Sequence, residues 1–215
     1  MRIQPFSIGP YGTISSVVYE NSRCVIIDAP FPSDSIIDFI RSNDLEPEAV
    51  YLTHAHYDHI FGLPEMLAEY PSLQIYLSSD DFIFTNDNYS YTMSLLKMAD
   101  RYFLSEIAEK EIKRMPGKFI AYEDTAGSFS VLRTPGHTPG SVSLYSEKEK
   151  ILFSGDTLFR GSIGRTDLGG SDEDTISSLR LLSRLPEDTV VIPGHGTATT
   201  IGEEKRNNPF MRNLG

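Results

Sequence analysis

Three of the five histidines in this sequence fall within six residues, at His54, His56 and His59. His54 and His56 are two positions apart, so an extended chain directs both side chains to the same side, where they can bind one cation. Asp58 adds a carboxylate before His59. Imidazole nitrogens and carboxylate oxygens together are typical ligands of Zn²⁺, Fe²⁺ or Mn²⁺. Because the cluster follows a short apolar segment and precedes a helical pattern, we interpret it as a metal site and not as a solvated polar turn.

Three further segments place a ligand-capable residue directly after an apolar strand: His137, Asp156 and His195. Short loops at strand ends often converge on one crevice in layered α/β proteins. Alone, either histidine would be an ordinary hydrogen-bonded residue and Asp156 a turn aspartate. The cluster at 54–59 and the shared Pro-Gly-His pattern favour metal ligands instead.

Five histidines and two aspartates give seven candidate ligands, which is enough for two metal ions with positions left for water and substrate. Structural zinc sites usually contain cysteine thiolates. The single Cys24 lies in an apolar strand, where it is expected to pack as a small hydrophobic residue. The ligand set therefore favours catalysis, although a binding module with purely structural metals is an alternative.

Other segments give weaker signals. The glycines at 161–164 and 169–170 lack the spacing of a phosphate-binding loop and are expected to form turns. No G-x-S-x-G sequence supports a nucleophilic serine. The segment 165–167 (Arg-Thr-Asp) follows Asp156 closely, and its arginine either forms a surface salt bridge or contacts the substrate.

The elements that must position these residues alternate between strands and helices. Ile36, Ile37 and Ile40 have helical spacing, and segments rich in β-branched residues indicate strands. We expect strands at 3–8, 13–19, 24–27, 49–52, 73–77, 119–122, 129–133, 142–145, 151–154 and 189–192, and helices at 33–43, 63–70 and 172–185.

Residues 78–118 depart from this alternation and predict a helical insertion. Met93, Leu96, Phe103, Leu104 and Ile107 recur at roughly helical intervals. The aromatic residues of the insertion, Tyr89, Tyr91 and Phe103, either line a substrate wall or pack between helices.

Composition limits the class of protein. A length of 215 residues suits one large domain. The formal net charge of −11 repels nucleic-acid phosphates and anionic membranes. Without a long apolar run or a signal-peptide pattern, and with one cysteine, a cytoplasmic protein without a protein partner is expected.

The motifs resemble those of the metallo-β-lactamase superfamily: H-x-H-x-D-H at 54–59, then Gly-His-Thr at 136–138, Gly-Asp-Thr at 155–157 and Gly-His-Gly at 194–196. Segments 158–167 and 200–210 further resemble short, glyoxalase II-like (hydroxyacylglutathione hydrolase-like) bacterial hydrolases. The resemblance implies a four-layer αββα sandwich as a single domain over residues 1–215.

The resemblance also implies a dinuclear centre, most simply of zinc, with iron or manganese as options. One metal would be bound by His54, His56 and His137, the second by Asp58, His59 and His195, and Asp156 would bridge them. The implied catalytic carboxylates are Asp58 and Asp156. A hydroxide shared by the metals would attack the carbonyl of a small thioester, such as S-lactoylglutathione.

The chain departs from the full-length glyoxalase II pattern after its last histidine. Only 20 residues follow His195, so no carboxyl-terminal helical glutathione-binding domain is expected. Gly196 and Thr197 replace an aromatic segment of the family, which leaves the thiol carrier open. Arg165 is the candidate for a contact with the substrate carboxylate.

A second enzymatic alternative follows from the same resemblance. Persulfide dioxygenases share this fold and bind a single Fe²⁺ on a face of two histidines and one carboxylate. Here that face would consist of His54, His137 and Asp156. The ligand residues alone do not separate this oxygenase from a hydrolase, whereas the metal content does.

Overall fold

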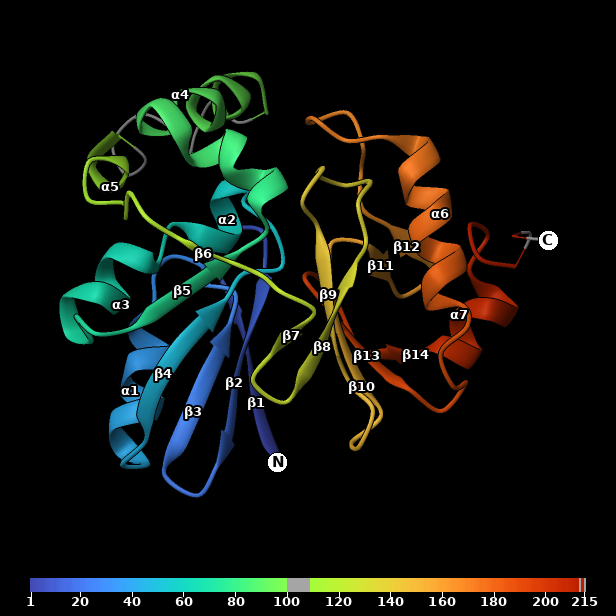
Figure 1. The fold of residues 1–215 in the computed structure, drawn as a ribbon, viewed down its shortest axis with the longest axis horizontal. Helices are drawn as coiled ribbons and strands as arrows, with labels where there is room; N and C mark the ends of the chain where they lie inside the picture. Colours follow the sequence, from blue (N-terminus) through green and yellow to red (C-terminus); the bar gives the residue numbers. More distant parts are fainter. Residues whose placement is uncertain (100–108, 213, 215) are drawn as a thin grey trace. The chain divides into compact units, whose positions relative to one another are not determined.

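The computed structural model describes residues 1–99, 109–212 and 214, which form two compact units. The first unit comprises Met1–Leu77 and Asp81–Ala121, and the second comprises Ser78–Asp80 and Tyr122–Gly215. In Figure 1 the first unit runs from blue to green and most of the second from yellow to red. Each unit is built on its own six-stranded sheet with helices beside it. The predicted α/β class is therefore confirmed.

The sheet of the first unit has the strand order β1-β2-β3-β4-β5-β6. Its first three strands are joined as antiparallel neighbours, and the pairs from β3 to β6 are parallel. Parallel strands end at the same edge of a sheet, so the loops after β3 and β4 leave from one edge. The strands are β1 Arg2–Ile8, β2 Thr13–Glu20, β3 Arg23–Ile27, β4 Glu46–Tyr51, β5 Gln74–Leu77 and β6 Ile120–Ala121.

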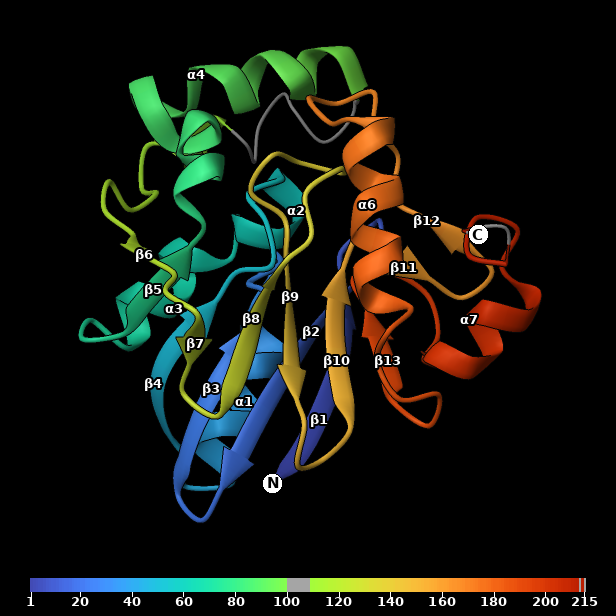
Figure 2. The ribbon, with the colours of Figure 1, turned by 45° about the vertical axis from the view of Figure 1, so that its right-hand side comes forward.

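Two crossover helices cover one face of this sheet, α1 (Asp34–Ser42) and α3 (Leu63–Glu69). Right-handed crossovers between successive parallel strands place both helices on the same side, as Figure 1 and Figure 2 show. The three isoleucines of α1 are at most 8% exposed, as their spacing predicts. A short helix, α2 (Tyr57–Ile60), contains the second half of the histidine cluster.

Between β5 and β6 the described residues include η1 (Ser79–Asp81), α4 (Phe82–Ala99) and α5 (Glu109–Ile112). Residues 86–89 interrupt α4 with non-helical backbone. Tyr89 is 3% exposed and donates to the Pro116 carbonyl at 2.5 Å. Burial raises the pKa of its phenol. Internal packing thus accounts for Tyr89, while Phe103, Leu104 and Ile107 lie outside the described residues.

The sheet of the second unit has the order β14-β13-β10-β9-β8-β7. Only the β10–β13 pair is parallel, and two antiparallel steps separate β8 from β10. Strands β8, β10 and β13 therefore end at the same edge. The strands are β7 Thr125–Ala126, β8 Phe129–Arg133, β9 Val142–Ser146, β10 Ile151–Gly155, β13 Val190–Pro193 and β14 Thr199–Thr200.

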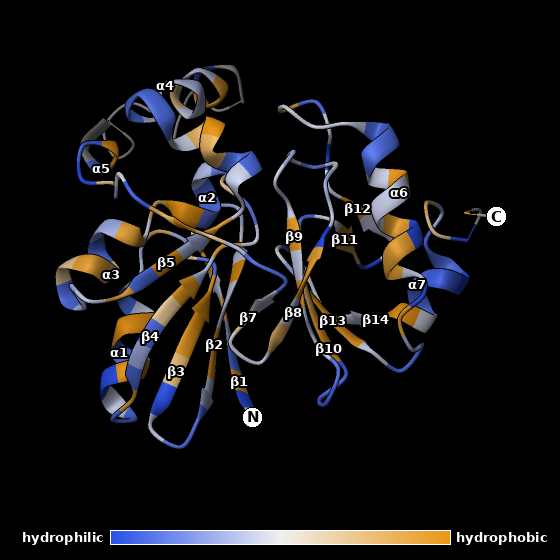
Figure 3. Cartoon of the chain, in the orientation of Figure 1, coloured by the Kyte–Doolittle hydropathy of each residue, from blue (hydrophilic) through white to orange (hydrophobic). Residues whose placement is uncertain are grey.

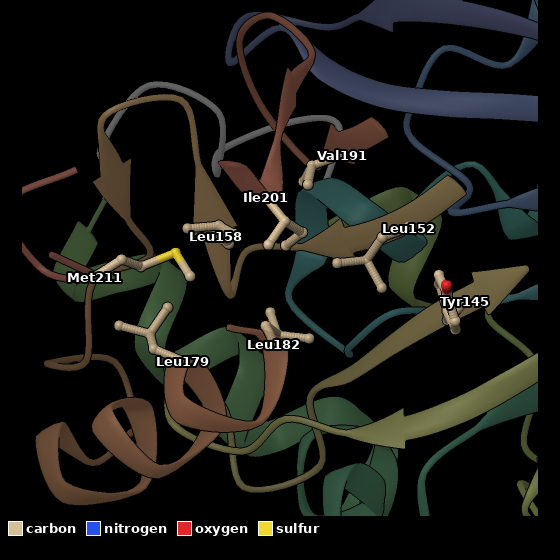
Figure 4. Close-up of a cluster of buried hydrophobic side chains, with 8 residues drawn as sticks. All are labelled: Tyr145, Leu152, Leu158, Leu179, Leu182, Val191, Ile201 and Met211. Carbon is tan, nitrogen blue, oxygen red and sulfur yellow. The ribbon is translucent and has the colours of Figure 1, made fainter. Parts of the chain in front are cut away.

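Helix α6 (Asp172–Leu182) covers this second sheet. Figure 4 shows its Leu179 and Leu182 directed at a cluster of buried apolar side chains. Ser171 caps the helix by accepting from the Asp174 amide. In Figure 3 the inner strands of both sheets are coloured as hydrophobic, whereas polar residues colour much of the helices. The cluster contains Tyr145, Leu152, Leu158, Leu179, Leu182, Val191, Ile201 and Met211.

One local prediction needs correction, and one helix was not predicted. Residues 161–164, predicted as turns, contain β12 (Ser162–Ile163), which pairs with β11 (Leu158–Phe159). Gly161 alone has the positive φ, +71°, that the turn between these strands requires. Helix α7 (Ile201–Asn207) had no counterpart among the predicted elements.

Candidate metal centre

The histidine cluster begins where β4 ends. His54 and His59 are fully buried and His56 is 7% exposed, and His56 is the N-cap residue of α2 with extended backbone angles. The ring centroid of His54 lies 4.9 Å from that of His56 and 4.1 Å from that of His59. A ring nitrogen of His54 lies within 4.8 Å of one in each of the other two. The first unit therefore gathers three imidazoles at the end of one strand.

Asp28, at the end of β3, fixes the orientation of this cluster. Its Oδ1 accepts from the Thr53 amide at 2.7 Å, and its Oδ2 accepts from the Thr53 hydroxyl at 2.8 Å. Nδ1 of His59 lies 2.9 Å from the same Oδ2. Asp28 is 1% exposed. A carboxylate only accepts, so His59 donates from Nδ1, and in the neutral tautomer Nε2 is the nitrogen that can bind a metal.

The same network sets the tautomer of His54. Thr53 Oγ1 lies 3.1 Å from Nδ1 of His54, and the one hydroxyl proton of Thr53 already goes to Asp28. Toward His54 the hydroxyl must accept, so Nδ1 carries the proton and Nε2 is basic. Such outer partners are typical of metal-binding histidines.

Asp58 lies beside the cluster in α2. One of its oxygens, Oδ2, accepts from the Thr13 hydroxyl at 2.9 Å and lies 3.6 Å from Nε2 of His59. The backbone amide of Ala55 donates to the buried carboxylate of Asp81 at 2.9 Å, which holds the connection between His54 and His56. All four predicted ligands of the first unit thus lie at one strand end.

The second unit brings together the other three predicted ligands. His137, Asp156 and His195 follow β8, β10 and β13, whose ends share one edge of the sheet. Oδ2 of Asp156 lies 3.4 Å from Nε2 of His137 and 3.4 Å from Nε2 of His195. Asp156 is 8% exposed and His137 is 6% exposed. One carboxylate oxygen therefore lies near two imidazole nitrogens.

A backbone carbonyl orients His137. The Arg165 carbonyl lies 2.6 Å from Nδ1 of His137 and can only accept, so the proton sits on Nδ1 and Nε2 is again basic. Gly164 makes this approach possible, because a Cβ there would lie 1.9 Å from the Asp156 carbonyl and 3.0 Å from Nδ1 of His137. The chain after β12 thus lies directly against two candidate ligands.

The side chain of Arg165 forms an exposed ion pair with Asp167, with N–O distances of 2.6 and 2.5 Å. Hydrogen bonding from the guanidinium lowers the pKa of Asp167 to about 2. The surface salt bridge that the sequence suggested is therefore present. A contact between Arg165 and a substrate stays a prediction.

The donor set of each unit suits divalent metal ions, because imidazole nitrogens and carboxylate oxygens are what zinc, iron and manganese bind. Sequence reasoning missed Asp28, Thr13, Thr53 and the Arg165 carbonyl. Asp28 did carry a signal, since it is a polar residue directly after an apolar strand.

Comparison with known proteins defines the class. The family model described as "Metallo-beta-lactamase superfamily" matches residues 8–195, and the chain belongs to this superfamily. Its fold is the metallo-β-lactamase fold, and the family is one of metallo-hydrolases.

Several known proteins are similar to this chain over nearly its whole length. A Haemophilus influenzae protein named "Hydroxyacylglutathione hydrolase GloC" is 34% identical, over 98% of this chain and 98% of its own length. The BLEG-1 B3 metallo-β-lactamase structure is 35% identical with a TM-score of 0.82, covering 98% of this chain and 99% of that one. TTHA1623 in a di-iron-bound form is 34% identical with a TM-score of 0.83, covering 96% and 99%. Among the described residues, no helix is long and apolar enough to cross a membrane.

Proposed function

We propose that this chain is a metal-dependent hydrolase of small thioesters, with an S-2-hydroxyacyl thiol such as S-lactoylglutathione as the substrate. The observation that carries the proposal is the state of the imidazoles. In His54, His59 and His137, Nδ1 lies within hydrogen-bond distance of a protein oxygen, so Nε2 is the nitrogen that each imidazole would offer to a metal. The whole-length similarity to the Haemophilus protein named as a hydroxyacylglutathione hydrolase supports the thioester.

The proposed centre contains two divalent ions. His54, His56 and His137 bind the first, Asp58, His59 and His195 bind the second, and Asp156 contacts both. The position of Asp156 Oδ2 between the Nε2 atoms of two histidines supports a shared carboxylate. Zinc, iron and manganese all suit this donor set, and the di-iron form of TTHA1623 supports iron as strongly as chemistry supports zinc.

When bound, the metals would supply Lewis acidity that activates a water molecule and polarises the thioester carbonyl. The protein's part is to hold the imidazoles and two carboxylates, Asp58 and Asp156, in fixed directions. Thr13 restrains Asp58 through its 2.9 Å hydrogen bond. Each metal ion would present a local positive charge to an anionic substrate, although the chain is acidic overall. Arg165, once released from Asp167, would contact the carboxylate of that substrate.

The test is metal content and turnover measured on the same anaerobic preparation. We expect two metal ions per chain and hydrolysis of S-lactoylglutathione, which is measured as the loss of thioester absorbance. His56→Ala and Asp156→Ala should abolish turnover while circular dichroism stays native, and exposed Asp38→Asn is the matched control. A fully metal-loaded protein that cleaves no thioester would refute the proposal.

The same preparation distinguishes the alternatives. The 35% identity to a B3 metallo-β-lactamase favours β-lactams as the second substrate class to assay. A single iron ion with oxygen uptake on a persulfide would identify the dioxygenase, with His54, His137 and Asp156 as its ligands. Unfolding after chelation would instead indicate structural metals. A cytoplasmic location without nucleic-acid, membrane or protein partners stays a prediction.

A further inference from the structure

The segment 200–210 contains two buried polar residues that the proposed chemistry does not use, Glu204 and Asn208. Glu204 lies in helix α7, and Asn208 is the C-cap residue of this helix. Thr200 caps the other end of the helix by accepting from the Glu203 amide. Glu204 is 2% exposed and Asn208 is fully buried. Burying a carboxylate and an amide is unfavourable unless each is hydrogen-bonded. Their partners therefore indicate what they are for.

Those partners include the backbone of the β11–β12 hairpin. Glu204 Oε2 accepts from the Gly161 amide and from Asn208 Nδ2, both at 2.8 Å, and its Oε1 accepts from the Thr199 hydroxyl at 2.6 Å. Asn208 Nδ2 also donates to the Ser162 carbonyl at 3.0 Å. Its Oδ1 accepts from the Phe210 amide at 2.9 Å. Two side chains thus bind the backbone of one turn.

The hairpin needs this support because its ladder is so short. Its strands have two residues each, and a two-stranded hairpin is marginal in water even when it is longer. Leu158 anchors its first strand in the core cluster beside Ile201 of α7 (Figure 4). The polar pair fixes the rest of the hairpin to the same helix.

The hairpin also lies directly against candidate metal ligands. It begins two residues after Asp156, and the ring of Phe159 lies edge-on to that of His195 with centroids 6.0 Å apart. Immediately after β12 comes Gly164, followed by the Arg165 carbonyl that orients His137. A shift of the hairpin would therefore move contacts of all three ligands in the second unit.

We propose that Glu204 and Asn208 are positioning residues for the metal site, acting through the β11–β12 hairpin on Asp156, His137 and His195. This inference rests on the proposed metal-dependent function. Changing a direct hydrogen-bond partner of a metal ligand typically alters metal affinity 10–100-fold. Glu204 and Asn208 act one step further out, through the hairpin, so the lower end of that range is expected.

Asn208→Asp tests the proposal because it preserves shape and exchanges the donor for an acceptor. The new carboxylate would face the Ser162 carbonyl and Glu204, so the hairpin contacts become repulsive. Asn207→Asp is the matched control, since Asn207 is the neighbouring exposed residue. Glu204→Gln should retain most binding, because the amide oxygen accepts from Gly161 and the amide nitrogen donates to Thr199. Glu204→Ala should not.

The readouts are metal affinity by chelator competition, the Co²⁺ absorption spectrum and the melting temperature of the metal-free protein. We expect Asn208→Asp and Glu204→Ala to weaken metal binding about 10-fold or more and to alter the Co²⁺ spectrum. The kcat should fall by a larger factor than any change in KM. Metal affinity within twofold of the parent, with only a lower melting temperature, would overturn the inference. If Asn208→Asp does not fold, Glu204→Gln against Glu204→Ala decides. A parent protein that binds metal but cleaves no thioester would refute the function and leave this inference standing.

Discussion

Replacing Asp28 by asparagine tests whether remote hydrogen bonds select the metal-binding nitrogens. The substitution keeps the shape of the side chain, and asparagine tolerates the φ of +59° at this position. It changes one acceptor oxygen into an NH₂ donor. Asp28 accepts three hydrogen bonds, two from Thr53 and one from His59, so one of them must be lost.

The consequence follows from counting protons. With the NH₂ group in place of Oδ2, His59 can no longer donate from Nδ1 and must place its proton on Nε2. The Thr53 hydroxyl accepts from the new NH₂ and turns its own proton toward His54, which reverses the tautomer of His54 as well. With the amide in the opposite orientation, the NH₂ group faces the Thr53 amide, and two donors meet in a buried site. A lost hydrogen bond to a charged group costs about 1.5–3 kcal/mol.

We therefore expect metal affinity to fall about 10–100-fold, which corresponds to roughly 1.4–2.8 kcal/mol. Chelator competition measures the affinity, and nitrogen-15 NMR of the metal-free protein reads the tautomers of His54 and His59 directly. Asp38→Asn is the control, because Asp38 is exposed on α1. Unchanged tautomers together with affinity within twofold of the parent would refute the reasoning.

Three further outcomes are expected. Gly164→Ala should lower metal affinity and stability by about 1–3 kcal/mol, because its Cβ would overlap the Asp156 carbonyl. Gly117→Ala, with open space around it, should change neither quantity. Metal titration measures the affinity, and thermal melting measures the stability. Asp167→Ala should lower the KM for an anionic thioester, and Arg165→Ala should raise it. Because the pKa of Asp167 is lowered to about 2, the ion pair should persist on acidification until the pH approaches that value. Equal KM values in the two variants would count against a contact between Arg165 and the substrate. Cys24 is 2% exposed and burial raises its pKa to about 12, so the native thiol should resist alkylation at pH 8 and react once the protein is unfolded.

Much of the fold could be predicted because the strands carry strong local signals. The α1 isoleucines and the apolar strands before each ligand gave correct elements, with bounds that shift by a few residues. Helix α7 was missed because it is only seven residues long and lacks an apolar stripe. The sequence Thr200 to Glu203 does fit a capping pattern, which was the available signal.

The candidate ligands were predicted from their types and spacing, and the structure brings the set of each unit together at its strand ends. Their hydrogen-bond partners could not be predicted. Asp28 lies 31 residues from His59, and Thr13 lies 45 residues from Asp58. Arg165 acts on His137 through its carbonyl, which every residue has, so no side-chain pattern reveals it. Only the fold brings these groups together.

The positions of the candidate ligands and the choice of the protonated nitrogen in each histidine are therefore controlled by different parts of each unit. Strand ends place His54, Asp156 and His195, and the ladders that hold those strands also stabilise the sheets. Distant groups such as Asp28 and the Arg165 carbonyl choose which nitrogen stays basic. Changes in the strands should consequently affect folding and metal binding together. Shape-preserving changes in the distant groups should lower metal affinity more than stability, and the ratio of the two losses identifies which kind of residue has been altered.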